Sequence, residues 1–256
     1  MKKYILNLTY FVICLFFLLP FMGIFFKSLN FKMWVYVLNS PNTYESLITT
    51  TAILFITVLI NFIIGTPVAA FLGREKSKLN FLLMILIILP LIIPVMVSTM
   101  GLQFAFIKLN LIDSVLGVSV VHSVATIPYY ILSMKSGYLT INKDYVKLGK
   151  ILGANPIQLF FKITLPLIYP SFLVGVSLTI VVSLAQYLIT FIIGGGRVIT
   201  LPILMMPYLV DGGITNGTVY SVIYIIFTYL LLFLLNSFTK NIYRKRDLHD
   251  SNKQCI

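Results

Sequence analysis

The chain has 256 residues and a net charge of +12, with 59% hydrophobic and only 10% charged residues. Soluble domains carry about 25% charged residues, so the composition excludes a water-soluble globular protein and indicates an integral membrane protein. The positive charge does not predict nucleic-acid binding, because the Lys and Arg residues gather in the segments between long apolar stretches.

Six of these apolar stretches are long enough for a bilayer-spanning helix, which needs roughly 20 residues. They cover residues 4–26, 45–72, 81–106, 114–138, 167–193 and 217–239. The first follows two lysines, as a signal peptide would, but it is longer than the apolar core of about 7–15 residues in a signal peptide, and no small-residue cleavage site follows it. We therefore expect an uncleaved first span and an all-α integral membrane protein, a bundle of six transmembrane helices.

Lys and Arg predict the orientation, because they concentrate in the cytoplasmic segments of membrane proteins. With the N-terminus inside, fifteen of the 19 basic residues fall in cytoplasmic segments, and only Lys27, Lys32, Lys108 and Arg197 fall outside. Both termini and the segment 141–166 are then cytoplasmic, in a multi-pass protein of the cell membrane. The basic tail, residues 241–256, is expected to rest on anionic lipid of the bilayer, and residues 1–240 to form the membrane domain.

The sequence carries no motif for nucleotide binding or catalysis. A phosphate loop needs Gly-x4-Gly-Lys-Ser/Thr, but around Gly149-Lys150 its first glycine is replaced by Asp144 and its hydroxyl by Ile151. The span interiors hold no acidic residue, whereas ion-driven carriers use buried carboxylates. The lone His122 is interpreted as a hydrogen-bonded residue near the outer surface. We expect no enzyme activity, cofactor or metal site, so energy for uphill transport has to come from a partner.

The segment 141–166 is a polar, lysine-rich break between the fourth and fifth apolar stretches. Residues 144–152 predict a helix that continues from span four and that Gly153 ends in a left-handed conformation. Asn155 as N-cap and Pro156 as first helical residue then begin a short amphipathic helix, which ends where a Leu-Pro pair breaks the chain. This pattern predicts a helix–turn–helix elbow with exposed aromatic residues at its tip. The alternative is an interfacial helix lying flat on the lipid headgroups.

The elbow resembles the "EAA" loop of binding-protein-dependent ABC importer permeases, because nine residues separate Gly153 from Ile163-x-Leu165-Pro166. The family carries a glutamate and two alanines before the glycine, whereas Lys147, Leu148 and Gly149 stand here, so the contact that the glutamate makes is in question. Three more patches resemble the family in the same order, and together they extend the resemblance over roughly 45–240: residues 64–70, 89–94 and 127–129.

The resemblance implies the permease subunit of an ABC importer, which forms half of the translocation pathway and hydrolyses no ATP itself. Its implied partners are a cytoplasmic ABC ATPase dimer, a second permease subunit and an extracytoplasmic solute-binding protein. In the family, the short helix of the elbow inserts into a groove of the ATPase. Carried over, the coupling residues are Gly153, Ala154, Asn155, Pro156, Ile157, Phe160, Phe161, Lys162, Leu165 and Pro166.

Polar residues in the fifth apolar stretch suggest where a solute passes. Ser183, Gln186, Thr190 and Gly194 lie there, the last three at i, i+4 and i+8 and therefore on one face of a helix. Such side chains either bond a neighbouring helix or line a hydrated path, and both interpretations stay open. The glycine run 194–196 is expected to give the outer mouth backbone freedom.

The stretch from Ser183 to Pro202 resembles permeases for polyamine, thiamine, ferric iron or phosphonate. The resemblance therefore implies a small polar or cationic solute as substrate. An ATP-independent channel, a membrane enzyme and a membrane-anchored scaffold are the alternative functions.

Overall fold

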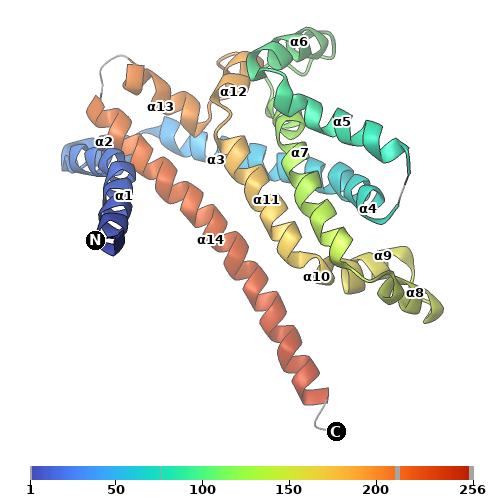
Figure 1. The fold of residues 1–256 in the computed structure, drawn as a ribbon. Coiled ribbons are helices and arrows are strands. Elements are labelled where there is room, and N and C mark those ends of the chain that lie inside the picture. Colours follow the sequence, from blue (N-terminus) through green and yellow to red (C-terminus); the bar gives the residue numbers. More distant parts are fainter. Residues whose placement is uncertain (1, 76, 211–213, 254–256) are drawn as a thin grey trace.

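The chain is almost entirely helical in the computed structural model, which describes residues 2–75, 77–210 and 214–253 (Figure 1). Within these ranges there is no β-strand. Two short stretches, η1 and η2, have the wider hydrogen-bonding pattern of a π-helix. In chain order the elements are α1 (Lys2–Lys27), α2 (Phe31–Asn39), α3 (Pro41–Ile60), η1 (Asn61–Gly65), α4 (Thr66–Arg74), α5 (Leu79–Ile92), α6 (Val95–Lys108), α7 (Val115–Thr140), α8 (Lys143–Ile151), α9 (Pro156–Gln158), η2 (Leu159–Thr164), α10 (Leu165–Leu167), α11 (Tyr169–Leu184), α12 (Tyr187–Gly194), α13 (Leu201–Val210) and α14 (Ile214–Lys253).

Four helical stretches in the described residues are long and apolar enough to cross a membrane. They are Leu6–Lys27, Pro41–Arg74, Val115–Thr140 and Asn216–Ser237. Two further pairs of helices are long and apolar enough when taken together, but each pair is sharply bent. The bend is 104° between α5 and α6, and 84° between the helical stretches Pro156–Leu167 and Tyr169–Leu184. The number of spans is therefore four, or up to six if each bent pair is one span.

The bend between α5 and α6 is sharper than the sequence predicts. The Pro90 and Pro94 pair indicated a kinked but single span over 81–106, whereas the chain breaks completely at Ile93-Pro94. Ile93 is extended, with φ −74° and ψ 130°, because a following proline disfavours the helical conformation. Pro94 then caps the N-terminus of α6. Pro90, by contrast, lies inside α5.

Helix α7 forms the centre of the bundle and packs against α3, α4 and α11. The largest buried cluster lies along its inner side and includes Tyr130, Ile131 and Met134. Two glycines allow α7 to lie close to η1 and to α11. A Cβ on Gly65 of η1 would lie 2.7 Å from the Tyr130 ring, and a Cβ on Gly137 of α7 would lie 2.7 Å from the Cβ of Ser171. Small residues at helix interfaces bring backbones together where no hydrophobic effect drives packing.

Buried hydroxyl and amide groups join the same helices. The Asn61 amide nitrogen donates to the hydroxyls of Thr126, at 2.8 Å, and Thr179, at 3.2 Å. The hydroxyls of Thr66 and Tyr130 lie 3.0 Å apart. These bonds link η1 and α4 to α7 and α11, so polar contacts supplement apolar packing along the centre of the bundle.

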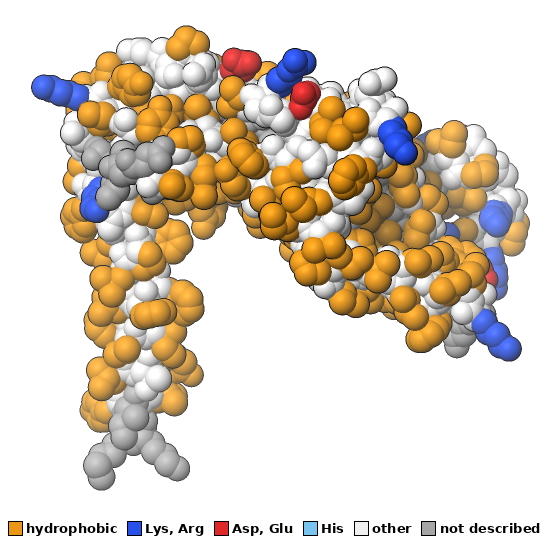
Figure 2. All heavy atoms as spheres, turned by 90° about the horizontal axis from the view of Figure 1, so that it is seen from above, with side chains coloured by type: hydrophobic (Ala, Val, Ile, Leu, Met, Phe, Trp, Pro, Cys, Tyr) orange, Lys and Arg blue, Asp and Glu red, His pale blue; other side chains and the backbone are white. Residues whose placement is uncertain are grey.

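The outer surface is apolar, as expected of a protein in lipid. Figure 2 shows hydrophobic side chains over most of the visible face and Lys and Arg at its margins. Helix α1 contacts α14, yet none of the apolar stretch by which α1 could cross a membrane is buried. The faces that the described helices leave open therefore suit a lipid environment or further protein.

Candidate functional site

The elbow lies at one end of the bundle, where α7 and α11 lead into α8, α9 and α10 (Figure 1). Its first arm, α8, is a separate helix and does not continue α7 as the sequence predicted. Helix α7 ends at Thr140, and Ile141 is extended, with φ −79° and ψ 128°. The side chain of Asn142 then caps α8 by accepting a hydrogen bond from the Asp144 N–H at 3.0 Å. A second N-cap signal, which the sequence interpretation missed, therefore starts this arm.

The turn between the two arms has the expected left-handed glycine. Gly153 has φ +80°, and a Schellman motif surrounds it: the Ala154 N–H donates to the Gly149 carbonyl and the Gly153 N–H to the Lys150 carbonyl, both at 3.0 Å. A side chain at Gly153 would meet no atom within 4 Å. Glycine is therefore favoured at this position by the backbone conformation and not by a lack of space for a side chain.

The second arm begins as predicted and continues further. Asn155 and Gln158 form a capping box, with the Gln158 N–H donating to the Asn155 side chain at 2.8 Å and the Asn155 N–H to the Gln158 side chain at 3.1 Å. Pro156 is the first helical residue. Leu165-Pro166 does not break the chain, because Pro166 lies in the first turn of α10, where a missing N–H is tolerated. The bend of 84° comes at Ile168.

Replacing Asn155 by alanine should loosen the second arm without unfolding the bundle. The capping box satisfies two backbone N–H groups that would otherwise lack a partner, and loss of such a cap costs about 1 kcal/mol. We expect amide hydrogen exchange at residues 157–160 to rise roughly fivefold while the amides of α7 stay protected. Asn155→Asp, which keeps the accepting oxygen, should restore most of the protection.

The two arms pack closely at Gly149, which occupies the position of a family alanine. A Cβ there would lie 2.5 Å from Leu159 Cδ2 and 2.7 Å from Ile163 Cδ1, so α8 and η2 approach more closely than an alanine allows. The nearby Lys147 points away from this contact. Its ammonium lies 3.4 Å from the Asp144 carboxylate, and both side chains are mostly exposed.

Phe160 and Phe161 differ in their surroundings, although the sequence predicted both at the exposed tip. Phe160 is partly buried and its ring lies 6.0 Å from that of Phe62 in η1. Phe161, whose ring is 4.9 Å from that of Phe160, is 54% exposed. Phe160 therefore joins the elbow to the bundle, and Phe161 lies beside it at the surface.

The exposed apolar surface at the tip consists of Ile151, Leu152 and Ile157, which are 80%, 85% and 70% exposed. Only Ile157 was among the predicted coupling residues. Ile151 and Leu152 end the polar helix α8, and two apolar residues directly before a C-terminal glycine are the signal that the sequence interpretation missed. We refer to these three residues as the elbow tip.

Arg74 connects the base of the elbow to the end of α4. Its Nη2 donates to the Thr164 hydroxyl at 3.3 Å, and its guanidinium carbon lies 4.9 Å from the centre of the Tyr138 ring. This cation–π geometry ties α4, α7 and η2 together. Movement of the elbow is thereby linked to two helices of the bundle.

At the opposite end of α11, the predicted pathway residues do not share one continuous helix. The chain breaks between α11 and α12, where Gln186 has φ −84° and ψ 61°. Ser183 lies in the last turn of α11 and Thr190 lies in α12, yet His122 of α7 joins them. Its Nδ1 is 2.8 Å from the Ser183 hydroxyl and its Nε2 is 3.0 Å from the Thr190 hydroxyl. His122 is hydrogen-bonded, as the sequence predicted. It is only 3% exposed, however, and is therefore buried and not at the outer surface.

Gly194 is the last residue of α12 and the first of the three consecutive glycines. Gly195 and Gly196 have φ of +51° and +80°, so the expected backbone freedom is used at two of the three glycines. Gly194 is buried, and a Cβ there would lie 2.9 Å from the Cβ of Val198. The structure thus places Ser183, Gln186 and Thr190 around one small cavity and leaves Gly194 outside it.

A capped elbow at one end of a polytopic helical bundle, with a polar cluster toward the other end, is the architecture of a membrane transport component. Residues 65–247 match the family "Binding-protein-dependent transport system inner membrane component". The chain belongs to that family.

Two curated relatives illustrate the range of the family. The chain is 28% identical over 178 residues to the molybdenum transport system permease protein ModB of Mycobacterium tuberculosis, covering 65% of this chain and 67% of the relative. It is 23% identical over 213 residues to the spermidine/putrescine transport system permease protein PotB of Haemophilus influenzae, covering 75% and 74%.

The fold is also that of a solved transporter. A bacterial ABC transporter involved in the import of the acidic polysaccharide alginate superposes with a TM-score of 0.74 at 16% identity, covering 93% of this chain and 95% of the other. At this identity the likeness concerns the fold alone.

Proposed function

We propose that this chain is the permease subunit of an ABC importer and that a separate ATPase binds its elbow tip. The observation that supports this most is the exposure of Ile151, Leu152 and Ile157 on either side of a turn that a Schellman motif and a capping box hold in shape. Exposed apolar side chains clustered on a rigid, projecting element are typical of a protein contact. The other predicted coupling residues, from Gly153 to Pro166, then serve mainly to shape and support this contact.

The proposed membrane arrangement counts α5 with α6 as the third span and α11 with α12 as the fifth, so that the elbow stays outside the bilayer. Six spans then cross the bilayer, with both termini and the elbow on the cytoplasmic side, where the excess of Lys and Arg belongs. Residues 1–240 form the permease domain, and the tail 241–256 lies on the cytoplasmic face. A second permease subunit supplies the other half of the pathway, and a solute-binding protein delivers solute to the outer mouth.

The proposed mechanism is alternating access driven by the partner. ATP binding and hydrolysis take place in the ATPase, since the sequence has no phosphate loop of its own. The elbow transmits a difference in affinity between two conformations, which is the only way a bound partner can shift an equilibrium. Arg74 lies where this transmission begins, because it contacts both Thr164 of the elbow and Tyr138 of α7.

The polar cluster of Ser183, Gln186 and Thr190 is our candidate for the path of the solute. The hydroxyl and amide groups there both donate and accept hydrogen bonds, so they suit a small polar solute of either charge. Polyamine, thiamine, ferric iron and phosphonate are the classes that the sequence suggests. The likeness to ModB adds molybdenum, and the likeness to PotB supports a polyamine.

The test is whether the tagged chain, purified from membranes of its own host, retains an ABC ATPase identified by mass spectrometry. Gly153→Val should reduce the retained ATPase at least tenfold, because a branched residue in the left-handed conformation costs about 1–2 kcal/mol and shifts the turn. Gly196→Val is the matched control, since Gly196 has the same φ of +80° and equally open surroundings. A parent chain that retains no ABC ATPase, or equal loss in both variants, contradicts the proposal.

A further inference from the structure

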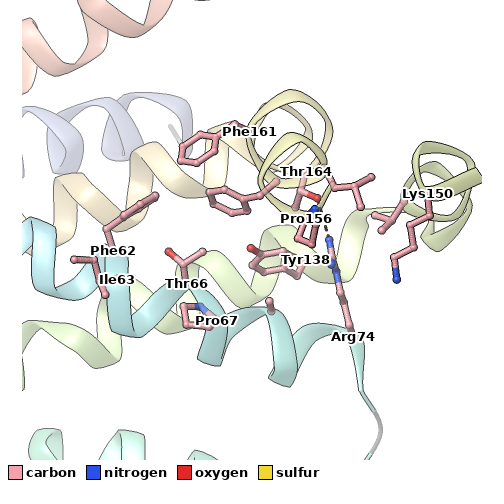
Figure 3. Close-up of a pocket in the computed structure, with 14 residues that line it drawn as sticks. Phe62, Ile63, Thr66, Pro67, Arg74, Tyr138, Lys150, Pro156, Phe161 and Thr164 are labelled. Atoms are coloured by element: carbon pink, nitrogen blue, oxygen red, sulfur yellow. Dashed lines mark hydrogen bonds between the residues drawn. The ribbon is translucent and has the colours of Figure 1, made fainter. Parts of the chain in front are cut away.

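A cavity of about 530 Å³ lies between the elbow and the end of α4 (Figure 3). Its volume is in the range of about 300–1,000 Å³ that small-molecule sites occupy. The two π-helical stretches face each other across it: η1 contributes Phe62 and Ile63, and η2 contributes Phe160, Phe161 and Thr164. Single-turn π-helical insertions are frequently found at functional sites, and here two of them shape one cavity.

The cavity has an apolar side and a cationic side. Figure 3 shows Phe62 and Ile63 at one side and the nitrogen atoms of Arg74 and Lys150 at the other, with Tyr138 between. All lining residues are described, and none is Asp or Glu. A ligand that matches both sides therefore has an anionic head and an apolar tail.

The cavity is also placed along the span as a membrane lipid would be. Arg74 is the last residue of the candidate span Pro41–Arg74. Ile63, eleven residues earlier in the sequence, lies roughly 16 Å further along the helix axis and is 61% exposed. One leaflet of the hydrocarbon core is about 15 Å deep, so the distance from cation to apolar wall corresponds to one acyl chain.

The cationic side is held in place by contacts within the chain. The Arg74 guanidinium donates to the Thr164 hydroxyl and lies over the Tyr138 ring, which fixes its position at the cavity wall. Lys150 reaches the same space from α8, where its side chain is exposed. Planar guanidinium groups match phosphate oxygens well, and an ammonium group adds a second charge.

We propose that this cavity binds one anionic phospholipid, with its phosphate between Arg74 and Lys150 and an acyl chain along Phe62, Ile63 and Phe161. Basic pockets between membrane helices are known to hold anionic headgroups. The site does not depend on the ATPase contact, because neither Arg74 nor Ile63 belongs to the elbow tip. The bound lipid would nevertheless lie between the elbow and the end of α4. Phe160 and Arg74 join these two elements by direct contacts with Phe62 and Thr164.

The experiment measures lipid binding to the full chain purified in detergent, by native mass spectrometry with phosphatidylglycerol and, separately, phosphatidylcholine. We expect the first phosphatidylglycerol to bind with higher affinity than phosphatidylcholine, and Lys150→Gln to weaken it about fivefold, the value of one basic residue near an anionic lipid. Arg74→Gln should weaken it at least as much. Arg74→Lys, which keeps the charge, should retain part of the affinity.

Lys147→Gln is the matched control, because Lys147 lies on the same helix as Lys150, has the same charge and does not line the cavity. Equal affinity for the two lipids overturns the proposal, and so does an equal loss in Lys147→Gln and Lys150→Gln, which would indicate general attraction to a basic surface. Excess soluble glycerol phosphate should not displace the bound lipid. If it does, the site recognises phosphate alone and the lipid assignment is wrong.

Discussion

Replacing Leu152 and Ile157 together by aspartate should abolish retention of the ABC ATPase by the purified chain. Both side chains are largely exposed, at 85% and 70%, so the substitutions remove no packing within the described chain. In an interface, truncating a central apolar anchor costs about 2 kcal/mol or more, and burying a carboxylate without a partner costs further. We expect the two changes together to weaken the complex at least ~100-fold.

The control for this prediction is Leu109→Asp. Leu109 is a 64% exposed leucine that directly follows α6, outside the elbow. The variant introduces one aspartate at a similarly exposed apolar position, and its ATPase retention should equal that of the parent. Undiminished retention in the double variant would show that the elbow tip is not the contact, while transport assays on the same proteins would reveal whether another surface couples them.

Replacing Gly137 by valine should destabilise the bundle and displace the elbow. A Cβ at Gly137 would lie 2.7 Å from the Cβ of Ser171 and 3.0 Å from the Cβ of Ile168. These atoms sit next to the backbone of α11 and of the bend, so they cannot rotate away. Overpacking of this kind costs typically 1–3 kcal/mol. We expect the unfolding temperature in detergent to fall by about 5 °C, with increased proteolysis at residues 153–158.

Gly101→Val is the matched control for this second prediction. Gly101 also lies within a helix, α6, but a Cβ there meets no atom within 4 Å. Its unfolding temperature should stay within about 2 °C of the parent, because a surface substitution away from packed contacts usually changes stability by less than 0.5 kcal/mol. Equal destabilisation by both substitutions would mean that helix propensity, and not the approach of α7 to α11, decides the outcome.

The features of the elbow that depend on neighbouring residues could be predicted from the sequence. The left-handed Gly153 and the N-cap pair Asn155-Pro156 follow from local backbone chemistry, and the structure confirms both. The predicted continuity of α7 into α8 is wrong because Asn142 offers a competing cap. Phe160 could not be placed from its neighbours, since its burial depends on Phe62, about a hundred residues earlier in the chain.

The breaks in the apolar stretches also differ in whether neighbouring or distant residues determine them. The break at Pro94 has a local cause, and the sequence underestimated only its size. The break at Gln186 has none, because no proline or glycine stands near it in the sequence. It is accompanied by hydrogen bonds between His122 and a hydroxyl of each flanking helix, and no pattern in residues 167–193 could indicate that partner. The all-helical fold was nevertheless predictable from composition and segment length alone.

The bonds of His122 have a consequence for the order in which the chain assembles. At the break, the Gln186 N–H donates to the Ser183 carbonyl at 3.2 Å and the Tyr187 N–H to the Ala185 carbonyl at 3.0 Å. His122 joins the two helices through their side chains, the hydroxyls of Ser183 and Thr190. His122 precedes the break in the chain by more than sixty residues and lies in α7, which is a candidate span of its own. In the proposed arrangement of spans, the imidazole of His122 therefore enters the bilayer before Ser183 and Thr190 during synthesis. Reversing that order, by circular permutation for example, would leave the broken span to enter alone.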